Sequence, residues 1–77
     1  MRAFITGITG FAGSHLAENL LNHNYEVFGT SLMGERRDYV AGIKNAISIA
    51  TADINDARAL KKAVTSAKPQ VVFHLAA

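Results

Sequence analysis

The chain has 77 residues, of which 49% are hydrophobic and 18% charged, a composition that excludes both a disordered segment and a multi-domain protein. It contains no cysteine, which excludes a disulfide framework and a thiolate metal site and fits a reducing compartment. Eight Lys/Arg and six Asp/Glu residues, spread along the chain, give a net charge of +2, which is too weak for a nucleic-acid-binding surface.

The first part of the chain predicts a strand followed by a helix. Arg2–Thr6 is a short apolar, β-prone run that Gly7 stops, a pattern typical of a buried strand. Beyond it, apolar residues recur every four positions at Ala12, Leu16 and Leu20, which predicts an amphipathic helix of about ten residues.

The middle of the chain predicts two further strands separated by a loop. Tyr25–Thr30 and Ala46–Ala50 are both β-prone runs. Between them, residues 31–45 contain Gly34, Gly42 and a cluster of charged residues. This pattern favours a loop with at most one helical turn over a full helix.

The last part of the chain predicts a second helix and a fourth strand. Either Asn55 or Asp56 is suited to cap the helix, and Pro69 ends it. Gln70–Leu75 is a continuous apolar run, typical of a parallel strand that is covered on both faces. The residues expected on the apolar face of this helix are Leu60, Val64 and Ala67.

The predicted order is β-α-β-loop-β-α-β. Such an alternation calls for an α/β fold with a parallel sheet and right-handed crossovers. We therefore predict the N-terminal part of a Rossmann-type doubly wound sheet, with the strands in the order 3-2-1-4. The chain stops directly after the fourth predicted strand, where such a fold continues into a further loop and helix, so we expect it to be incomplete.

The location of the protein follows from its apolar runs. The longest of them is only a few residues, too short to cross a membrane, and no signal peptide precedes the first predicted strand. We therefore expect a cytoplasmic protein with neither a membrane nor a nucleic acid as a partner.

Three glycines mark the candidate site. Gly7, Gly10 and Gly13 stand three residues apart in TGITGFAG, between a strand and a helix. A dinucleotide-binding loop needs this arrangement for a tight turn, for close approach of the backbone to a pyrophosphate, and for close packing of the helix start. The helix start adds unpaired N–H groups and about half a positive charge, and Ser14 is within reach of the same phosphate.

A strand-to-helix turn without a ligand is the alternative interpretation of these glycines. A P-loop is excluded because Ser14-His15 replaces the required Lys-Ser or Lys-Thr pair.

The adenosine end of a dinucleotide is expected about twenty residues beyond the glycines. The second predicted strand ends there at Ser31, with no acid to bind the ribose 2′-hydroxyl of NAD. Arg36 and Arg37 are the nearest cations and are suited to bind the 2′-phosphate of NADP. We therefore expect NADP, with NAD as the alternative, and Ser31 among the contacts. A solvated charged loop is the alternative for either arginine.

Three segments carry a family resemblance. TGITGFAGSHLAENLL, TADINDARAL and KPQVVFHLAA resemble the extended short-chain dehydrogenase/reductase family of nucleotide-sugar epimerases, dehydratases and reductases, over essentially the whole chain. Within the family they are most similar to the branch of GDP-mannose 4,6-dehydratase and GDP-4-keto-6-deoxy-mannose reductase. The resemblance implies a homo-oligomeric, NAD(P)-dependent parent enzyme that acts on a GDP-mannose derivative.

The resemblance also implies cofactor contacts. Phe11 and Ala12 join the three glycines in backbone contacts to the pyrophosphate. Asp53 and Ile54 match the family's pair beside the adenine, where the aspartate accepts from the exocyclic amine. Capping of the second helix is the alternative role for this aspartate. The segment implied to pass the adenine ribose and the nicotinamide side comprises Leu75, Ala76 and Ala77.

Catalysis in this family resembles a Ser/Thr, Tyr and Lys constellation whose Tyr-x-x-x-Lys element lies beyond the fourth strand. Neither tyrosine of this chain matches it: Tyr25 opens a predicted strand, and Tyr39 is followed four positions later by Ile43. His74 is expected to be a packed strand-end histidine rather than an acid–base. Residues 1–77 then form an incomplete NAD(P)-binding Rossmann domain with no catalytic residue and no metal ligand, and a nucleotide sugar binds only with the segments that are missing.

Two other hypotheses remain open from the residues alone. The first is a non-catalytic dinucleotide-binding or redox-sensing protein on the same fold, because fold and function are separable. The second is an isolated half-fold that self-assembles through the uncovered apolar edge of its fourth strand.

Overall fold

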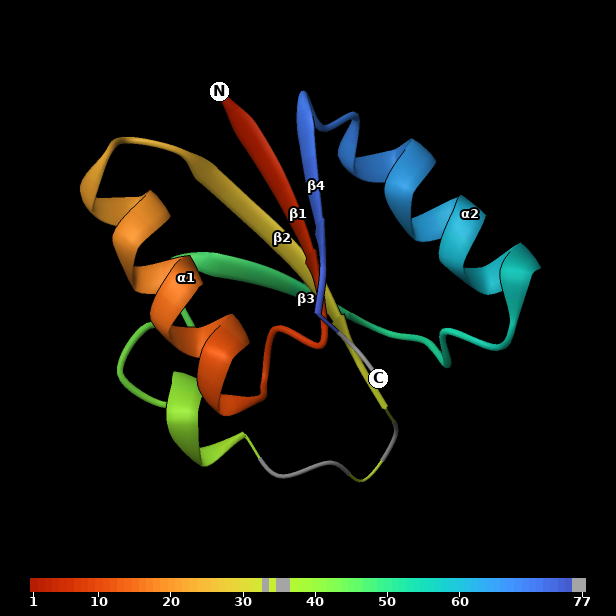
Figure 1. The fold of residues 1–77 in the computed structure, drawn as a ribbon, viewed down its shortest axis with the longest axis horizontal. Coiled ribbons are helices and arrows are strands. Elements are labelled where there is room, and N and C mark those ends of the chain that lie inside the picture. Colours follow the sequence, from red (N-terminus) through yellow and green to blue (C-terminus); the bar gives the residue numbers. More distant parts are fainter. Residues whose placement is uncertain (33, 35–36, 76–77) are drawn as a thin grey trace.

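The computed structural model describes residues 1–32, 34 and 37–75 (Figure 1). Four parallel strands form one sheet in the order β3-β2-β1-β4, which confirms the predicted strand order. The strands are β1 (Arg2–Thr6), β2 (Glu26–Ser31), β3 (Ile47–Thr51) and β4 (Val71–His74). The helices are α1 (Phe11–Asn22) and α2 (Ala57–Ala67), and a single 3-10 turn, η1 (Asp38–Val40), interrupts the loop between β2 and β3.

The two helices cover opposite faces of the sheet, with α1 to the left and α2 to the right in Figure 1. This follows from the order of the strands, because the chain moves outward from β1 to β3 and then crosses back to β4 on the other side of β1. With right-handed crossovers, the reversal places the second helix on the other face. The carboxyl ends of all four strands meet at one edge, where this fold binds ligands.

The main core lies between α1 and the sheet. Its fully or almost fully buried members are Ala3, Ile5, Ile8, Ala17, Leu20 and Val27. Gly29 allows this packing, because a β-carbon there would stand 2.6 Å from both the Ile5 carbonyl oxygen and the Ile8 Cβ. Only a residue without a side chain lets Ile8 close the core over β2.

The buried stripe of α1 differs from the predicted one. Ala12 is exposed, and the buried positions are Gly13, Ser14, Ala17 and Leu20. Placing Ala12 on the apolar face was therefore wrong. The first turn of the helix packs on the backbone of the preceding loop through Gly13, and a glycine adds nothing to a hydrophobic pattern.

The second helix begins and ends where the sequence predicts. The Asp56 side chain accepts a hydrogen bond from the Ala59 N–H (3.1 Å), which confirms an N-cap at this position. Lys68 adopts a left-handed conformation (φ 49°) after the last turn, and Pro69 follows. Ala67 is buried on the predicted apolar face, while Leu60 and Val64 are half-buried.

The strand β4 is less covered than its apolar run predicts. It is an edge strand of the described sheet, paired with β1. Val71 and Phe73 pack partly against the main core, whereas Val72, on the α2 face, is 49% exposed. Within the described residues, no helix is long and apolar enough to cross a membrane.

Candidate cofactor-binding site

A cleft of about 340 Å³ lies at the carboxyl edge of the sheet. Segments that follow each of the four strands line it, so residues far apart in the sequence meet there. The lining residues are Gly7, Gly10, Thr30, Ser31, Leu32, Ala52, Asp53, Ile54, Asn55 and Leu75. Among them are the predicted cofactor contacts Gly7, Gly10, Ser31, Asp53, Ile54 and Leu75.

A second hollow, of about 430 Å³, lies between α2 and the outer part of the sheet. Small and apolar side chains line most of it, and Lys62 is its one charged lining residue among those described. None of the residues predicted to bind the cofactor lines it, so we assign the site to the cleft.

The turn after β1 is held by a glycine conformation and by backbone hydrogen bonds. Gly7 has a positive φ of 72°, which a residue with a side chain adopts only with strain. The Gly10 N–H closes the turn on the Gly7 carbonyl (3.1 Å), and the Ile8 N–H donates to the Thr30 carbonyl of β2 (3.1 Å). These bonds fix the loop against the sheet at the mouth of the cleft.

The other two glycines serve different purposes. A β-carbon on Gly13 would overlap the Gly7 carbonyl oxygen, so the packing of α1 itself requires this glycine. Gly10 has an ordinary φ of −74°, and a β-carbon there would make only a van der Waals contact with the Gly7 carbonyl oxygen, at 3.4 Å. The fold therefore does not require glycine at position 10. A bare backbone facing the cleft fits a ligand that comes close, as a pyrophosphate does.

The positive end of α1 also fits an anion. The helix begins at Phe11 with no side-chain cap and no acid in its first turn, so its first N–H groups are left for a ligand. Ala12 shares this exposed first turn. Ser14, however, is 4% exposed and donates its hydroxyl to the Phe11 carbonyl (2.8 Å). Its hydroxyl is engaged inside the helix, so the suggestion that it reaches a phosphate is wrong for this conformation.

The aspartates after β3 have separate positions. Asp56 caps α2, whereas Asp53 lines the cleft and its carboxylate accepts from the Asn55 N–H (2.8 Å). This local turn leaves Asp53 exposed beside Ile54 at the end of β3. The capping alternative considered for Asp53 therefore belongs to Asp56.

A guanidinium group stands at the end of β2. The Arg37 Nη2 atom donates to the Ser31 hydroxyl (3.1 Å) and lies 3.5 Å from the Thr51 hydroxyl of β3. The structure thus places Arg37 against Ser31, which lines the cleft, although Arg37 itself is not among the lining residues. Three other predicted contacts, Arg36, Ala76 and Ala77, lie outside the described residues.

His74 connects two strand ends. Its Nδ1 atom lies 2.9 Å from the Thr6 hydroxyl, and the next residue, Leu75, donates its N–H to that hydroxyl (3.0 Å) and to the Thr6 carbonyl (3.3 Å). The histidine therefore helps to join β4 to β1, in keeping with the structural role expected for it. The residues described include no group of three or more side chains that could hold a metal ion.

The sequence does not predict some of the residues that line the cleft. Thr30 and Asn55 both line it. Thr30 pairs with Thr6 across β1 and β2, and Asn55 sits in the turn made by Asp53. A polar residue at the end of an otherwise apolar strand is the signal that marks Thr30 in the sequence.

Comparisons with known proteins show similarity over almost the whole chain. The human GDP-mannose 4,6 dehydratase is 35% identical over 85 residues, which cover 97% of this chain and 23% of that protein. The crystal structure of the Bordetella bronchiseptica enzyme WbmH in complex with NAD+ superposes with a TM-score of 0.85 at 31% identity, covering 99% of this chain and 25% of that one. The crystal structure of the Thermus thermophilus UDP-glucose 4-epimerase in complex with NAD superposes with a TM-score of 0.83 at 33% identity, and the match covers 100% of this chain and 24% of that one. The chain thus spans about a quarter of the length of these proteins.

The fold, the glycine loop and these similarities define a Rossmann-type domain of the extended short-chain dehydrogenase/reductases. The family model for GDP-mannose 4,6 dehydratase matches residues 4–77, and the chain belongs to this family of NAD(P)-dependent nucleotide-sugar dehydratases and epimerases.

Proposed function

We propose that this chain is the NADP(H)-binding portion of a nucleotide-sugar dehydratase, reductase or epimerase that acts on a GDP-mannose derivative. The observation that carries the proposal is the cleft that joins Gly7 and Gly10 to the end of β2, where Arg37 stands. When bound, the nicotinamide supplies hydride transfer to and from a sugar carbon. The residues of this chain hold the cofactor, and the chemistry at the sugar belongs to segments outside it.

The pyrophosphate is assigned to the glycine loop. Gly7 turns the chain, Gly10 keeps the backbone bare, and the N–H groups of Phe11 and Ala12 at the uncapped start of α1 face the anion. A helix N-terminus provides both hydrogen-bond donors and a favourable field for a diphosphate. No lysine is required at this position.

The adenosine is assigned to the other end of the cleft. The exposed Asp53 carboxylate is placed to accept from the exocyclic amine of adenine, with Ile54 beside the ring. Leu75 closes the cleft from the end of β4. We assign Ala76 and Ala77 to the continuation of this contact on the basis of the family resemblance.

The choice of NADP over NAD rests on charge. Ser31 at the end of β2 offers no carboxylate to the ribose 2′-hydroxyl, while the Arg37 guanidinium lies within 3.1 Å of its hydroxyl. A planar cation with several donors suits a 2′-phosphate. Arg36 is proposed as a second cation for the same group. Several of the solved relatives are complexes with NAD or NAD+, so the experiment below compares NADPH directly with NADH.

The substrate and setting are proposed from the family. The family model and the human relative support GDP-mannose over the UDP-sugar of the Thermus relative. We also propose that the protein is a homo-oligomer, on the basis of the family resemblance, and that it is cytoplasmic, because a chain without cysteine fits a reducing compartment.

Calorimetric titration of the 77-residue chain with NADPH and with NADH tests the binding proposal, after circular dichroism has confirmed that the chain is folded. We expect micromolar binding of NADPH and weaker binding of NADH. A folded chain that binds neither would contradict the proposal, and equal affinities would contradict the preference for NADP. Light scattering on the same sample tests the alternative of self-assembly through β4.

The enzymatic part of the proposal is tested on a longer protein that carries this chain together with a Tyr-x-x-x-Lys element. We expect it to convert a GDP-mannose derivative in the presence of NADP(H). A parent protein that binds the dinucleotide but lacks this element would instead support a non-catalytic, redox-sensing role.

A further inference from the structure

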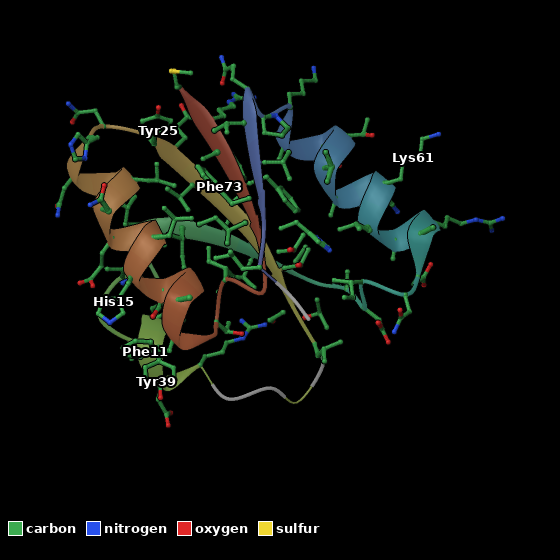
Figure 2. The ribbon with its side chains drawn as sticks, in the orientation of Figure 1. Phe11, His15, Tyr25, Tyr39, Lys61 and Phe73 are labelled. Atoms are coloured by element: carbon green, nitrogen blue, oxygen red, sulfur yellow. The ribbon has the colours of Figure 1, made fainter. Side chains whose placement is uncertain are left out.

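Three aromatic rings gather at the start of α1 and are not used by the cofactor contacts described above (Figure 2). The Phe11 ring lies edge-on to the rings of His15 and Tyr39, with centroids 4.5 Å and 5.6 Å away. Phe11 and Tyr39 remain 63% and 62% exposed. The rings therefore meet at the surface, and burial in the core does not explain their contact.

The contact between Phe11 and Tyr39 joins two elements. Phe11 opens α1 directly after the glycine loop, whereas Tyr39 is the middle residue of η1. Val40, the last residue of η1, is fully buried, and its N–H donates to the Arg37 carbonyl (3.2 Å). Arg37 and Tyr39 therefore belong to one short turn, and the ring pair fixes that turn against the start of α1.

This turn carries one of the two anion-binding positions of the proposed site, and through Tyr39 it contacts the other. One is the start of α1 at Phe11, to which the proposal assigns the pyrophosphate, and the other is the Arg37 guanidinium beside Ser31, to which it assigns the 2′-phosphate. In NADP both anions are attached to the same adenosine, so their spacing is restricted. The contact between Phe11 and Tyr39 sets the corresponding distance in the protein, that between the start of α1 and the Arg37 guanidinium.

We propose that Tyr39 is a positioning residue for cofactor selectivity. Its ring, packed on Phe11, holds Arg37 at the spacing that a 2′-phosphate requires and so favours NADPH over NADH. The inference rests on the proposed function, and it assigns Tyr39 no contact with the cofactor itself. The edge-on geometry suits the quadrupoles of two aromatic rings, so the phenol oxygen is not needed for this role.

Titration of the wild-type chain and of Tyr39→Ala and Tyr39→Phe with NADPH and NADH tests the inference. We expect Tyr39→Ala to weaken NADPH binding about fivefold, the size of one aromatic pair, and to leave NADH binding within about twofold. Tyr39→Phe keeps the ring and should restore the wild-type ratio of affinities. His15→Ala is the matched control, because it removes the other ring on Phe11 without touching the turn of Arg37.

The possible outcomes separate this inference from the proposed function. A wild-type chain that prefers NADPH, with Tyr39→Ala showing the same preference, overturns the inference alone. Equal losses for both cofactors also overturn it, because they indicate a purely structural role. A wild-type chain that binds neither cofactor, or shows no preference, overturns the proposed site and the inference together. If Tyr39→Ala does not fold, Tyr39→Leu retains apolar bulk without a ring and should show the same loss of selectivity.

Discussion

Gly13 packs directly on Gly7, so closely that a β-carbon at position 13 would overlap the Gly7 carbonyl oxygen and stand 2.9 Å from the Ile8 Cα. The atoms it would meet belong to backbone, which cannot rotate away as a side chain does. This contact brings the start of α1 against the turn that follows β1. It therefore places the positive end of the helix at the mouth of the cleft.

Gly13→Ala is expected to destabilise the fold. We predict a free energy of unfolding lower by roughly 2 kcal/mol, because overpacking against backbone costs more than the helix propensity that alanine gains. Urea denaturation followed by circular dichroism measures the change. Gly42→Ala is the control, since a β-carbon there would meet nothing within 4 Å. Equal stability of the two variants would show that α1 can shift to accept the methyl group.

Gly10→Ala should separate binding from folding. Its ordinary φ of −74° and the 3.4 Å contact of the added carbon predict a free energy of unfolding within about 1 kcal/mol of the wild type. The same methyl group would occupy the space through which a pyrophosphate approaches the backbone. We therefore expect dinucleotide affinity to fall about tenfold or more, as measured by calorimetry. Unchanged affinity in a folded variant would remove the pyrophosphate from this loop.

The elements and the glycine loop could be predicted from the sequence because their signals are local. Which face of α1 is buried could not be predicted. Apolar residues spaced by four suggest a face that begins at Ala12, but the helix packs on the sheet through Gly13, and a glycine has no side chain that a hydrophobic pattern could detect.

Contacts between distant segments also could not be predicted from the sequence. The hydrogen bond between Thr6 and His74 depends on the register of β1 with β4, and the Phe11–Tyr39 ring contact depends on where a loop returns. A single sequence carries no signal for either, whereas the cleft residues that belong to motifs, such as Asp53, were identified.

Replacing the two aspartates near the start of α2 should affect different properties, stability for one and cofactor binding for the other. Asp56→Ala removes the cap on the Ala59 N–H and is expected to lower the free energy of unfolding by about 1 kcal/mol without changing cofactor affinity. Asp53→Ala should instead weaken dinucleotide binding while costing little stability, because this carboxylate lines the cleft. Thermal unfolding and calorimetry on both variants check the assignment. If Asp56→Ala weakened dinucleotide binding and Asp53→Ala did not, the assignment of the two roles would be wrong.

Arg37 carries the last prediction, the preference for a 2′-phosphate. Because it stands at the end of β2 beside Ser31, Arg37→Ala should weaken NADPH binding about tenfold and leave NADH binding unchanged, the size of one charge-assisted hydrogen bond. Arg37→Lys should restore only part of the affinity, because an ammonium group lacks the planar fork of donors.

Lys44→Ala is the matched control for Arg37, because both cations line the same hollow beside β3, whereas only Arg37 contacts Ser31, a residue of the cofactor cleft. We expect its affinities for both cofactors to match those of the wild type. The difference between NADPH and NADH should also shrink as ionic strength rises, since exposed charges are screened. Equal losses for the two cofactors in Arg37→Ala would show that the guanidinium supports the loop and does not read the 2′-phosphate.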